Sequence, residues 1–149
     1  MGTGASDPPA VKPSIERKEL GVHIRPAKMQ DARLLFNWRN DPATRAMSIT
    51  SGELNWEMHL GWLSSRLSLP DPCIFITEVS GCAIGTFRID GDEISFTVAP
   101  EARGRGHATE MLRLAREMFG SKIAVVKPEN QASAVAARGA GHRVRFLVD

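Results

Sequence analysis

One stretch, residues 98–108, decides the predicted fold and reads VAPEARGRGHA. A β-branched strand ends where this stretch begins, and a loop with Gly104 and Gly106 then leads directly into a long amphipathic segment. Such a junction points backbone N–H groups and the positive end of a helix at one spot, and glycine lets a ligand come close. With the charges of Arg103 and Arg105, the stretch predicts a cradle for a phosphate or pyrophosphate group. A tight strand-to-helix turn with solvated arginines is the alternative.

The segments on either side of this loop predict alternating strands and helices. Apolar and β-branched runs predict strands, and apolar residues spaced three or four apart predict helices. Strands are expected at residues 22–25, 73–79, 82–89, 93–98, 123–126 and 143–148. Helices are expected at residues 30–40, 55–67, 106–119 and 131–137, with a polar loop at 44–52. The order β-α-α-β-β-β-α-β-α-β predicts a mixed α/β fold, with a mostly antiparallel twisted sheet and helices on both faces.

The 149 residues fit one compact domain. Residues 1–20 are rich in Gly, Ser, Pro and charge, which is typical of a flexible tail, so the domain is expected over residues 21–149.

Composition excludes several functional classes. The 19 Lys and Arg exceed the 17 Asp and Glu by only +2, which predicts no nucleic-acid partner. No apolar run reaches the about 18 residues of a membrane span, and no secretory signal is evident. Cys73 and Cys82 lie in apolar stretches and are expected to be buried thiols in a reducing, cytoplasmic location. Metal-binding spacings are absent, so no metal is expected. The chain has no Tyr, which excludes a tyrosine proton donor.

Within the glycine loop, the pattern Arg103-x-x-Gly106-x-Ala108 resembles the acetyl-CoA signature of the GNAT acetyltransferase superfamily. Downstream, KPENQAS at residues 127–133 and AGH at residues 140–142 resemble that superfamily's N-x-x-A/S…G-F ending, with His142 in place of the usual Phe. The resemblance covers about residues 22–149. It implies the GNAT fold and an acetyl-CoA-dependent N-acetyltransferase, in which a primary amine attacks the thioester directly.

Two further motifs resemble the sugar-nucleotide N-acetyltransferases of pseudaminic-acid-type biosynthesis. They are LFNWRNDP at residues 35–42 and Trp56-x-x-His59-x-x-Trp62. This resemblance implies an acceptor amine on a UDP-linked amino-deoxy sugar. Arginines would pair with the diphosphate, and a tryptophan would stack on the base. The residues expected to bind the acceptor are Trp38, Arg39, Asn40, His59, Trp62 and Arg88. The alternative for Trp38 and Trp62 is a role as core anchors.

The resemblance also assigns residues to the cofactor. The strand at residues 93–98 and the next strand would splay apart, and a bulge near the end of the first would free backbone groups. Phe96, Thr97 and Val98 would contact the pantetheine arm, with the Val98 N–H as the oxyanion donor. Asn130 and Ser133 would also contact this arm, and Asn130 would alternatively cap a helix. The pyrophosphate would be held by Arg103, Gly104, Arg105, Gly106, His107, Ala108 and Thr109, with His107 acting through its backbone.

A base or a water chain must take a proton from the acceptor amine. Glu93, His59 and Glu129 are the candidate bases. Glu93 would alternatively be a solvated side chain, His59 a packing residue on its helix, and Glu129 an acid in the first turn of a helix. Many GNAT enzymes place a Tyr seven residues after the Asn, where this chain has Ala137. Pseudaminic-type enzymes can place a carboxylate on the preceding strand, where this chain reads AVV at residues 124–126. The proton path therefore departs from the family pattern.

Other functions stay open at this point. The acceptor amine would alternatively belong to a protein N-terminus, a polyamine or an antibiotic. The missing tyrosine also leaves room for a GNAT module that binds acyl-CoA without catalysis. The C-terminal strand is expected at a sheet edge, where it could pair with a second subunit and form a homodimer.

Overall fold

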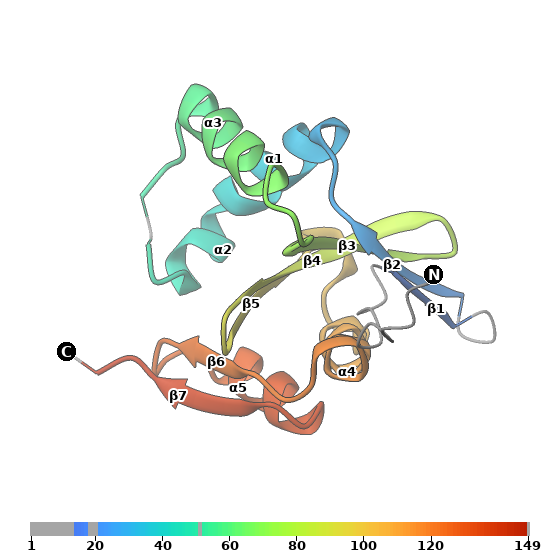
Figure 1. Ribbon diagram of the computed structural model, residues 1–149. Coiled ribbons are helices and arrows are strands. Elements are labelled where there is room, and N and C mark those ends of the chain that lie inside the picture. The colour runs from blue at the N-terminus through green and yellow to red at the C-terminus, as the bar shows by residue number, and fades with distance from the viewer. Residues whose placement is uncertain (1–13, 18–20, 51, 149) are drawn as a thin grey trace, which may run out of the picture.

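The computed structural model describes residues 14–17, 21–50 and 52–148 (Figure 1). Within these residues seven strands form one sheet in chain order. The strands are β1 Ile15–Arg17, β2 Val22–Pro26, β3 Ile74–Val79, β4 Cys82–Asp90, β5 Glu93–Val98, β6 Ile123–Val126 and β7 Arg143–Phe146. Strands β1 to β5 are antiparallel, and β6 and β7 join in parallel. The α-helices are α1 Ala32–Asn40, α2 Pro42–Met47, α3 Trp56–Leu67, α4 His107–Phe119 and α5 Gln131–Gly139.

The helices cover both faces of this sheet, which confirms the predicted mixed α/β architecture (Figure 1). Helices α1, α2 and α3 lie on one face, and α4 and α5 lie on the other. Each face has its own apolar core. Leu35, Trp38 and Leu63 pack on the first face, in a cluster that also contains Ile76.

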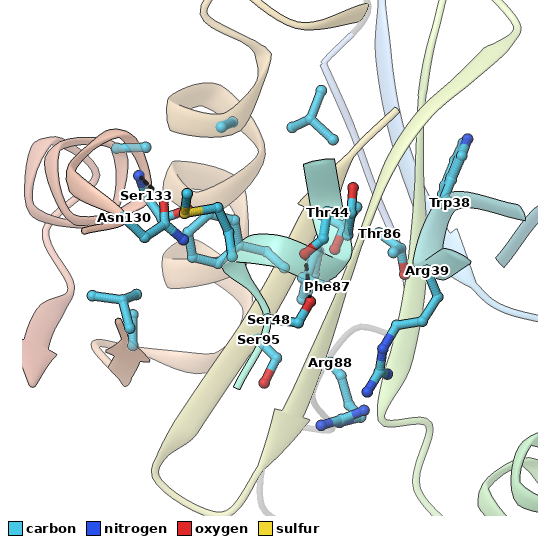
Figure 2. Close-up of a pocket in the computed structure, with 18 of the residues that line it drawn as sticks. Trp38, Arg39, Thr44, Ser48, Thr86, Phe87, Arg88, Ser95, Asn130 and Ser133 are labelled. Carbon is cyan, nitrogen blue, oxygen red and sulfur yellow. Dashed lines mark hydrogen bonds between the residues drawn. The ribbon is translucent and has the colours of Figure 1, made fainter. Parts of the chain in front are cut away.

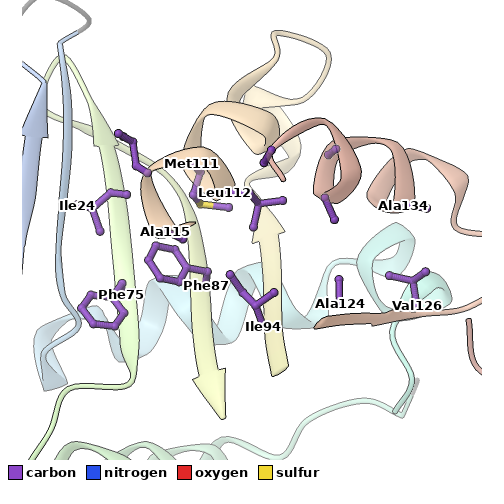
Figure 3. Close-up of a cluster of buried hydrophobic side chains, with 14 of the residues drawn as sticks. Ile24, Phe75, Phe87, Ile94, Met111, Leu112, Ala115, Ala124, Val126 and Ala134 are labelled. Atoms are coloured by element: carbon purple, nitrogen blue, oxygen red, sulfur yellow. The ribbon is translucent and has the colours of Figure 1, made fainter. Parts of the chain in front are cut away.

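The core on the second face holds β5 and β6 against the amphipathic helix α4. Figure 3 shows Met111, Leu112 and Ala115 of α4 over Phe75 and Phe87 of the sheet. The two phenylalanine rings stack with centroids 5.1 Å apart. Burying a side chain of this size contributes roughly 1.5–3 kcal/mol, so this face fixes where the α4 N-terminus lies.

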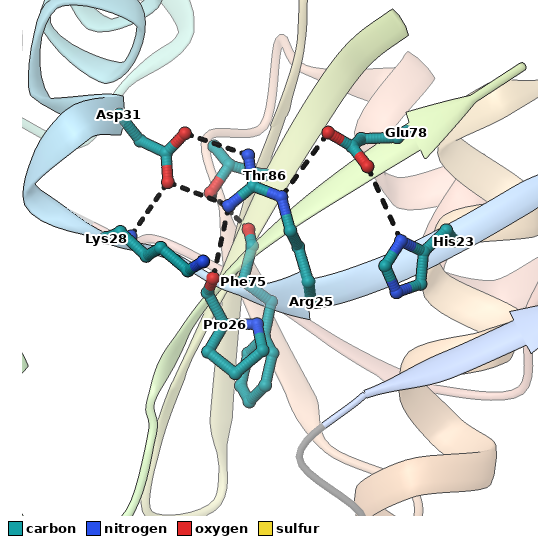
Figure 4. Close-up of polar contacts among 8 residues, drawn as sticks. All are labelled: His23, Arg25, Pro26, Lys28, Asp31, Phe75, Glu78 and Thr86. Atoms are coloured by element: carbon teal, nitrogen blue, oxygen red, sulfur yellow. Dashed lines mark hydrogen bonds and ion pairs between the residues drawn. The ribbon is translucent and has the colours of Figure 1, made fainter. Parts of the chain in front are cut away.

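A polar network fixes the start of α1 on the sheet (Figure 4). Arg25 of β2 donates two hydrogen bonds of 2.9 Å to the Asp31 carboxylate and a third of 3.3 Å to Glu78. The Lys28 backbone N–H donates to Asp31 as well, at 2.8 Å. Burial raises the pKa of Asp31, but the hydrogen bonds from Arg25 and Lys28 outweigh it, so the pKa lies below its usual value. Asp31 is therefore a buried carboxylate that stays ionised because Arg25 faces it.

Two elements differ from the sequence prediction. Residues 15–17, inside the predicted tail, form strand β1, with Ile15 opposite Ile24 of β2. The expectation of a flexible tail does not hold for these three residues, and residues 1–13 and 18–20 lie outside the described residues. The predicted polar loop at 44–52 is also partly wrong, because α2 occupies residues 42–47.

Helix α2 forms because the dipeptide between α1 and α2 both ends the first helix and starts the second. Asp41-Pro42 ends α1, as expected, but Pro42 also suits the first turn of a new helix. The Asp41 carboxylate then accepts from the Thr44 N–H at 3.1 Å, which caps α2.

The structure also tests the predictions about the cysteines, the bulge in β5 and membrane spans. Cys73 is half-buried, whereas Cys82 is exposed, so the prediction of two buried thiols is wrong for Cys82; both are free. The predicted bulge near the end of β5 is also absent, since β5 pairs with β4 in unbroken register from Glu93 to Val98. The register shift lies instead at Thr77 and Glu78, between β3 and β4. No helix among the described residues is long and apolar enough to cross a membrane.

Candidate functional site

A cavity of about 720 Å³ opens where β5 and β6 diverge, and it extends from α5 to α1 and α3. The two strands pair only at Glu93 and Ile123, so the predicted splay is confirmed. Figure 2 shows Asn130 and Ser133 at one end of the cavity and Arg39 with Arg88 at the other. Residues from helices, strands and the glycine loop, far apart in the sequence, thus meet around one space.

The splay leaves backbone groups of β5 facing the cavity. The Ile123 N–H donates to Asp92 O at 2.7 Å, and the Ala99 N–H donates to Ile84 O at 2.7 Å. Backbone groups alternate in direction along a strand, so the even-numbered residues of β5 point toward β6. Phe96 and Val98 lie beyond the single bridge to β6, and no backbone partner for their N–H groups is found in the described part of the chain. These groups are free to bind a ligand that enters the cavity.

The glycine loop closes the same end of β5. Gly104 and Gly106 both have φ of 78°, a left-handed conformation that favours glycine. Gly106 stands immediately before α4, a helix of 13 residues. A Cβ built on either glycine would meet no atom within 4 Å, so the space over the N–H groups of the first turn is open. The loop has the geometry of an anion cradle, as the sequence predicts.

The two arginines of the glycine loop, Arg103 and Arg105, do not both face the cavity as expected. The Arg103 guanidinium donates to Thr44 Oγ1 at 2.5 Å and to Asp41 Oδ2 at 3.4 Å, which ties the loop to α2. Arg105 is exposed and does not line the cavity. The cradle is therefore built mainly of backbone N–H groups, with Arg103 holding it in place.

Asn130 lies at the other wall of the splay, and its predicted role as a helix cap is confirmed. Its side-chain oxygen accepts from the Ser133 N–H at 3.3 Å and caps α5, while both residues line the cavity. The Lys127 ammonium donates to Ala46 O at 3.0 Å, which joins the β6–α5 connection to the end of α2. Helix α2 is thereby held across the opening between β5 and β6.

The first face of the sheet supplies the opposite end of the cavity. Trp38 is 4% exposed and belongs to the core, so the alternative prediction of a core anchor is confirmed. Trp38 also lines the cavity. Asn40 does not line this cavity. Its amide oxygen accepts from the Leu54 N–H at 2.8 Å, which fixes the segment before α3.

His59 lines the cavity but is committed to a structural contact. It is 5% exposed, and its Nε2 lies 3.0 Å from Ala32 O, the geometry of an N–H donating to a carbonyl. Trp56 and Trp62 flank its ring at 5.9 and 6.0 Å. Burial lowers the pKa of His59, and the charge of Arg39 lowers it further. The imidazole therefore stays neutral near pH 7.

Arg39 and Arg88 converge on this end from α1 and β4 (Figure 2). Arg88 donates through Nε to Asp90 at 2.7 Å, and its guanidinium carbon lies 5.4 Å from the centre of the Trp62 ring. Arg39 has no hydrogen bond or ion pair with any described residue. Burial and the facing charge of Arg88 lower the pKa of Arg39.

The candidate bases lie far from the free end of β5. Glu93 lines the cavity at the start of β5, five residues from Val98, or about 16 Å along the strand. Its carboxylate is half-exposed and lies 3.7 Å from Arg145. Glu129 is exposed and outside the cavity. A proton path from the region of Val98 to Glu93 needs water between them.

Most predicted site residues meet at this cavity, and Asn40, Arg105 and Glu129 are the exceptions. The sequence analysis missed the wall formed by α2 and the segment after it, residues 43–50. The pattern Asp41-Pro42-x-Thr44 could have revealed this wall, because it combines a capping residue with proline at the first helical position.

Solved structures of acetyltransferases share this fold. An N-acetyltransferase from Staphylococcus aureus Mu50 is 21% identical, with a TM-score of 0.60 over 78% of this chain and 80% of that one. The spermidine N-acetyltransferase from Vibrio cholerae, in complex with CoA and spermine, is 15% identical, with a TM-score of 0.69 over 81% and 80%. AAC(6')-Ib, in complex with paromomycin and acetyl-CoA, is 19% identical, with a TM-score of 0.66 over 81% and 82%. At these identities the likeness shows the fold.

The family is identified by sequence. No curated protein matches the chain. The family model described as Acetyltransferase (GNAT) domain matches residues 22–143, which is most of the chain and includes the glycine loop and the splayed strands. The predicted superfamily is therefore confirmed, and with it the predicted enzyme class: the chain belongs to the GNAT acetyltransferase domain family.

Proposed function

We propose that the protein transfers the acetyl group of acetyl-CoA to a primary amine, with the thioester lying against the free edge of β5. The observation that carries this proposal is the pair of N–H groups at Phe96 and Val98, which have no backbone partner among the described residues and lie beside the open glycine loop. A structural neighbour that binds acetyl-CoA has the same fold and supports the choice of acyl donor.

The residues along the splay match successive parts of the acetyl-CoA molecule. The N–H groups around Gly104 and Gly106 would hold the pyrophosphate, and Phe96 and Val98 would bind the pantetheine arm. Asn130 and Ser133 line the opposite wall. Bound acetyl-CoA supplies an activated acyl group, and the Val98 N–H would stabilise negative charge on its carbonyl oxygen.

The acceptor amine would enter from the α1 and α3 side, and we propose that it belongs to a nucleotide-linked amino-deoxy sugar. The motifs around Trp38 and His59 support this choice, since both residues line that end of the cavity. Glu93, Ser95 and Thr97 share one face of β5, so a row of waters along them could carry the amine proton to Glu93. In this proposal His59 holds α1 against α3 rather than taking the proton.

Three further expectations accompany this proposal. The active unit is the single domain expected over residues 21–149, with strand β1 added at the sheet edge, its location is the cytoplasm, and it works as a homodimer joined through the edge strand β7. The edge position of β7 supports the last of these.

Calorimetric titration with acetyl-CoA tests the donor site. Wild type should bind with micromolar affinity, and Gly106→Trp should abolish binding by filling the cradle. Gly91→Trp is the matched control, since Gly91 also has positive φ and open space but lies in the β4–β5 turn, away from the cavity. Equal binding by wild type and Gly106→Trp would contradict the site.

Release of free thiol tests catalysis separately. Wild type with acetyl-CoA should release CoA when a UDP-linked amino sugar is added. Binding of acetyl-CoA without thiol release on any amine would identify a non-catalytic acyl-CoA module instead.

A further inference from the structure

Helix α2 belongs to the wall of the cavity, yet it adds nothing to the two apolar cores. Of the described residues that form the core clusters, none belongs to α2. Its one buried residue is Thr44, and Met47 at its end is exposed and lines the cavity. A helix of six residues does not stand by itself, because isolated helices shorter than about 12–15 residues are marginal in water. Helix α2 therefore depends on polar contacts with the segments around it.

Two side chains from the walls of the expected cofactor site bind α2. From the glycine loop, Arg103 donates through one terminal nitrogen to Thr44 Oγ1 at 2.5 Å and through the other to Asp41 Oδ2 at 3.4 Å. From the connection between β6 and α5, the Lys127 ammonium donates to Ala46 O at 3.0 Å. The Thr44 hydroxyl in turn donates to Asp41 at 3.2 Å, so the helix cap and the buried threonine form one cluster with the guanidinium. Arg103 therefore binds the start of α2, and Lys127 binds its end.

The side chain and the backbone of the glycine loop face different elements. Both terminal nitrogens of Arg103 are used on α2, so its guanidinium is not directed at the phosphate that the sequence analysis expected it to hold. The backbone N–H groups around Gly104 and Gly106 remain open to an anion. Arginine suits this arrangement because its planar group presents separate N–H donors in a fixed fork. One loop thus joins the donor end of the cavity to α2.

We propose that Arg103 is a positioning residue that couples the two substrates: an anion bound on the glycine loop fixes Arg103, and Arg103 fixes α2 as a wall for the acceptor. The two states are α2 docked on Arg103 and α2 released. A bound anion favours the first, because it holds the loop in the conformation from which Arg103 reaches Thr44. Met47 and Ile49, which line the cavity, are then held in place for the acceptor. The inference rests on the proposed function, since it links the donor and acceptor ends of that same site.

Trypsin cleavage after Arg45 tests the coupling, because this bond lies inside α2 and is accessible only when the helix opens. Mass spectrometry follows the fragment that begins at Ala46, with and without saturating CoA as the probe. In wild type CoA should slow the cleavage by about 5-fold or more, as a typical coupling free energy does. Arg103→Met should be cleaved about 10-fold faster without CoA, the effect of losing a hydrogen bond to a charged group. CoA should then slow its cleavage by less than about 2-fold. Arg103→Lys, which keeps one charged donor, should restore part of the slowing.

Lys127→Met is the matched control, because it removes a contact at the other end of the same helix. It should also speed the cleavage, yet CoA should still slow it as in wild type. A purely structural Arg103 would make Arg103→Met behave like Lys127→Met and would overturn the proposal. Absence of slowing in wild type, or loss of the slowing in both variants, would overturn it as well.

Calorimetry separates this proposal from the proposed function. If the proposed function fails, wild type will not bind acetyl-CoA. If it holds, Arg103→Met should bind CoA within about 3-fold of wild type, because the backbone N–H groups of the loop are unchanged. Loss of CoA binding by Arg103→Met, with wild type binding normally, would place the side chain on the phosphate and overturn the coupling.

Discussion

Arg25 on β2 and Arg39 on α1 carry the same guanidinium group in two different surroundings. Arg25 donates to Asp31 through both terminal nitrogens and to Glu78 through Nε, and its pKa is raised by these partners. Arg39 has no carboxylate partner among the described residues, faces Arg88, and has a lowered pKa. Both side chains are half-buried.

The contrast indicates which charges serve the fold and which serve a ligand. A guanidinium that only supports the structure is stabilised by carboxylates that the chain itself provides. A guanidinium left without such partners in a cavity adds a local positive potential that an anionic molecule can satisfy. A difference of role between Arg25 and Arg39 is what the proposed function predicts, and it can be tested at either residue.

The largest expected effect comes from leaving the half-buried Arg25 with Glu78 as its one remaining carboxylate partner among the described residues. Asp31→Ala removes the main partner of Arg25 and should lower the free energy of unfolding by about 3 kcal/mol in urea denaturation. Asp71→Ala, an exposed position, should leave it unchanged within about 0.5 kcal/mol. A loss below about 1 kcal/mol at Asp31 would mean that the pairing of Arg25 contributes little, and the comparison would fail.

Removing both partners together should recover much of that loss. Arg25→Met with Asp31→Ala removes the Arg25–Asp31 pair and leaves only the half-buried Glu78 carboxylate, so the double variant should be about 1–2 kcal/mol more stable than Asp31→Ala alone. The measurement is a double-mutant cycle in urea. Strictly additive losses would show that packing of the side chains, and not the unpaired charge, sets the cost.

Low pH creates unpaired charge at two buried histidines. Burial lowers the pKa of both His59 and His142 below 6.5, and His142 already accepts from the Lys122 N–H through Nδ1 at 3.0 Å. Below pH 6.5 the unfolded chain therefore binds protons that the folded chain does not, and stability falls as pH falls. Each histidine should contribute a slope of at most about 1.4 kcal/mol per pH unit.

Unfolding free energies measured from pH 7.5 to 5 check this slope. His142→Gln should flatten it, and so should His59→Gln. A stability that is constant over this range in wild type would contradict the assignment of two neutral buried histidines.

The smallest effect is expected at Arg39, the arginine that we predict to face the acceptor. Arg39→Met removes a desolvated like charge and should leave the unfolding free energy unchanged or raise it by up to about 1 kcal/mol, as replacements at binding sites often do. Thermal and urea unfolding measure it. A loss comparable to that of Asp31→Ala would place Arg39 with Arg25 among the structural charges.

Much of the fold follows from the sequence, because its long elements have clear periodicity. Strands at residues 93–98 and 123–126 have the predicted bounds, and α4 begins one residue later than expected. Helix α2 has only six residues, too few for an apolar pattern to emerge. Strand β1 was hidden by the polar composition around Ile15, since only pairing with β2 makes it a strand.

The site was predictable where it depends on local backbone and not where it depends on distant side chains. The glycine loop and the free edge of β5 follow from short motifs. Asn40 lies beside Arg39 in sequence, yet it binds the backbone of Leu54 instead of the cavity. The resemblance predicted both Arg39 and Arg88 at the acceptor end, and both line the cavity. The effect of the Arg88 charge on Arg39, across 49 residues of sequence, follows from no spacing in the sequence.

The single bridge between β5 and β6 has a consequence for hydrogen exchange. Amide protons that bond within a sheet exchange only when the sheet opens, whereas those without a partner exchange with water that enters the cavity. Phe96 and Val98 lie between residues whose N–H groups point toward β4, yet their own N–H groups have no such partner in the described part of the chain. Two fast-exchanging amides in the middle of a slow strand should therefore act as intrinsic reporters, slowed when a molecule occupies the edge of β5.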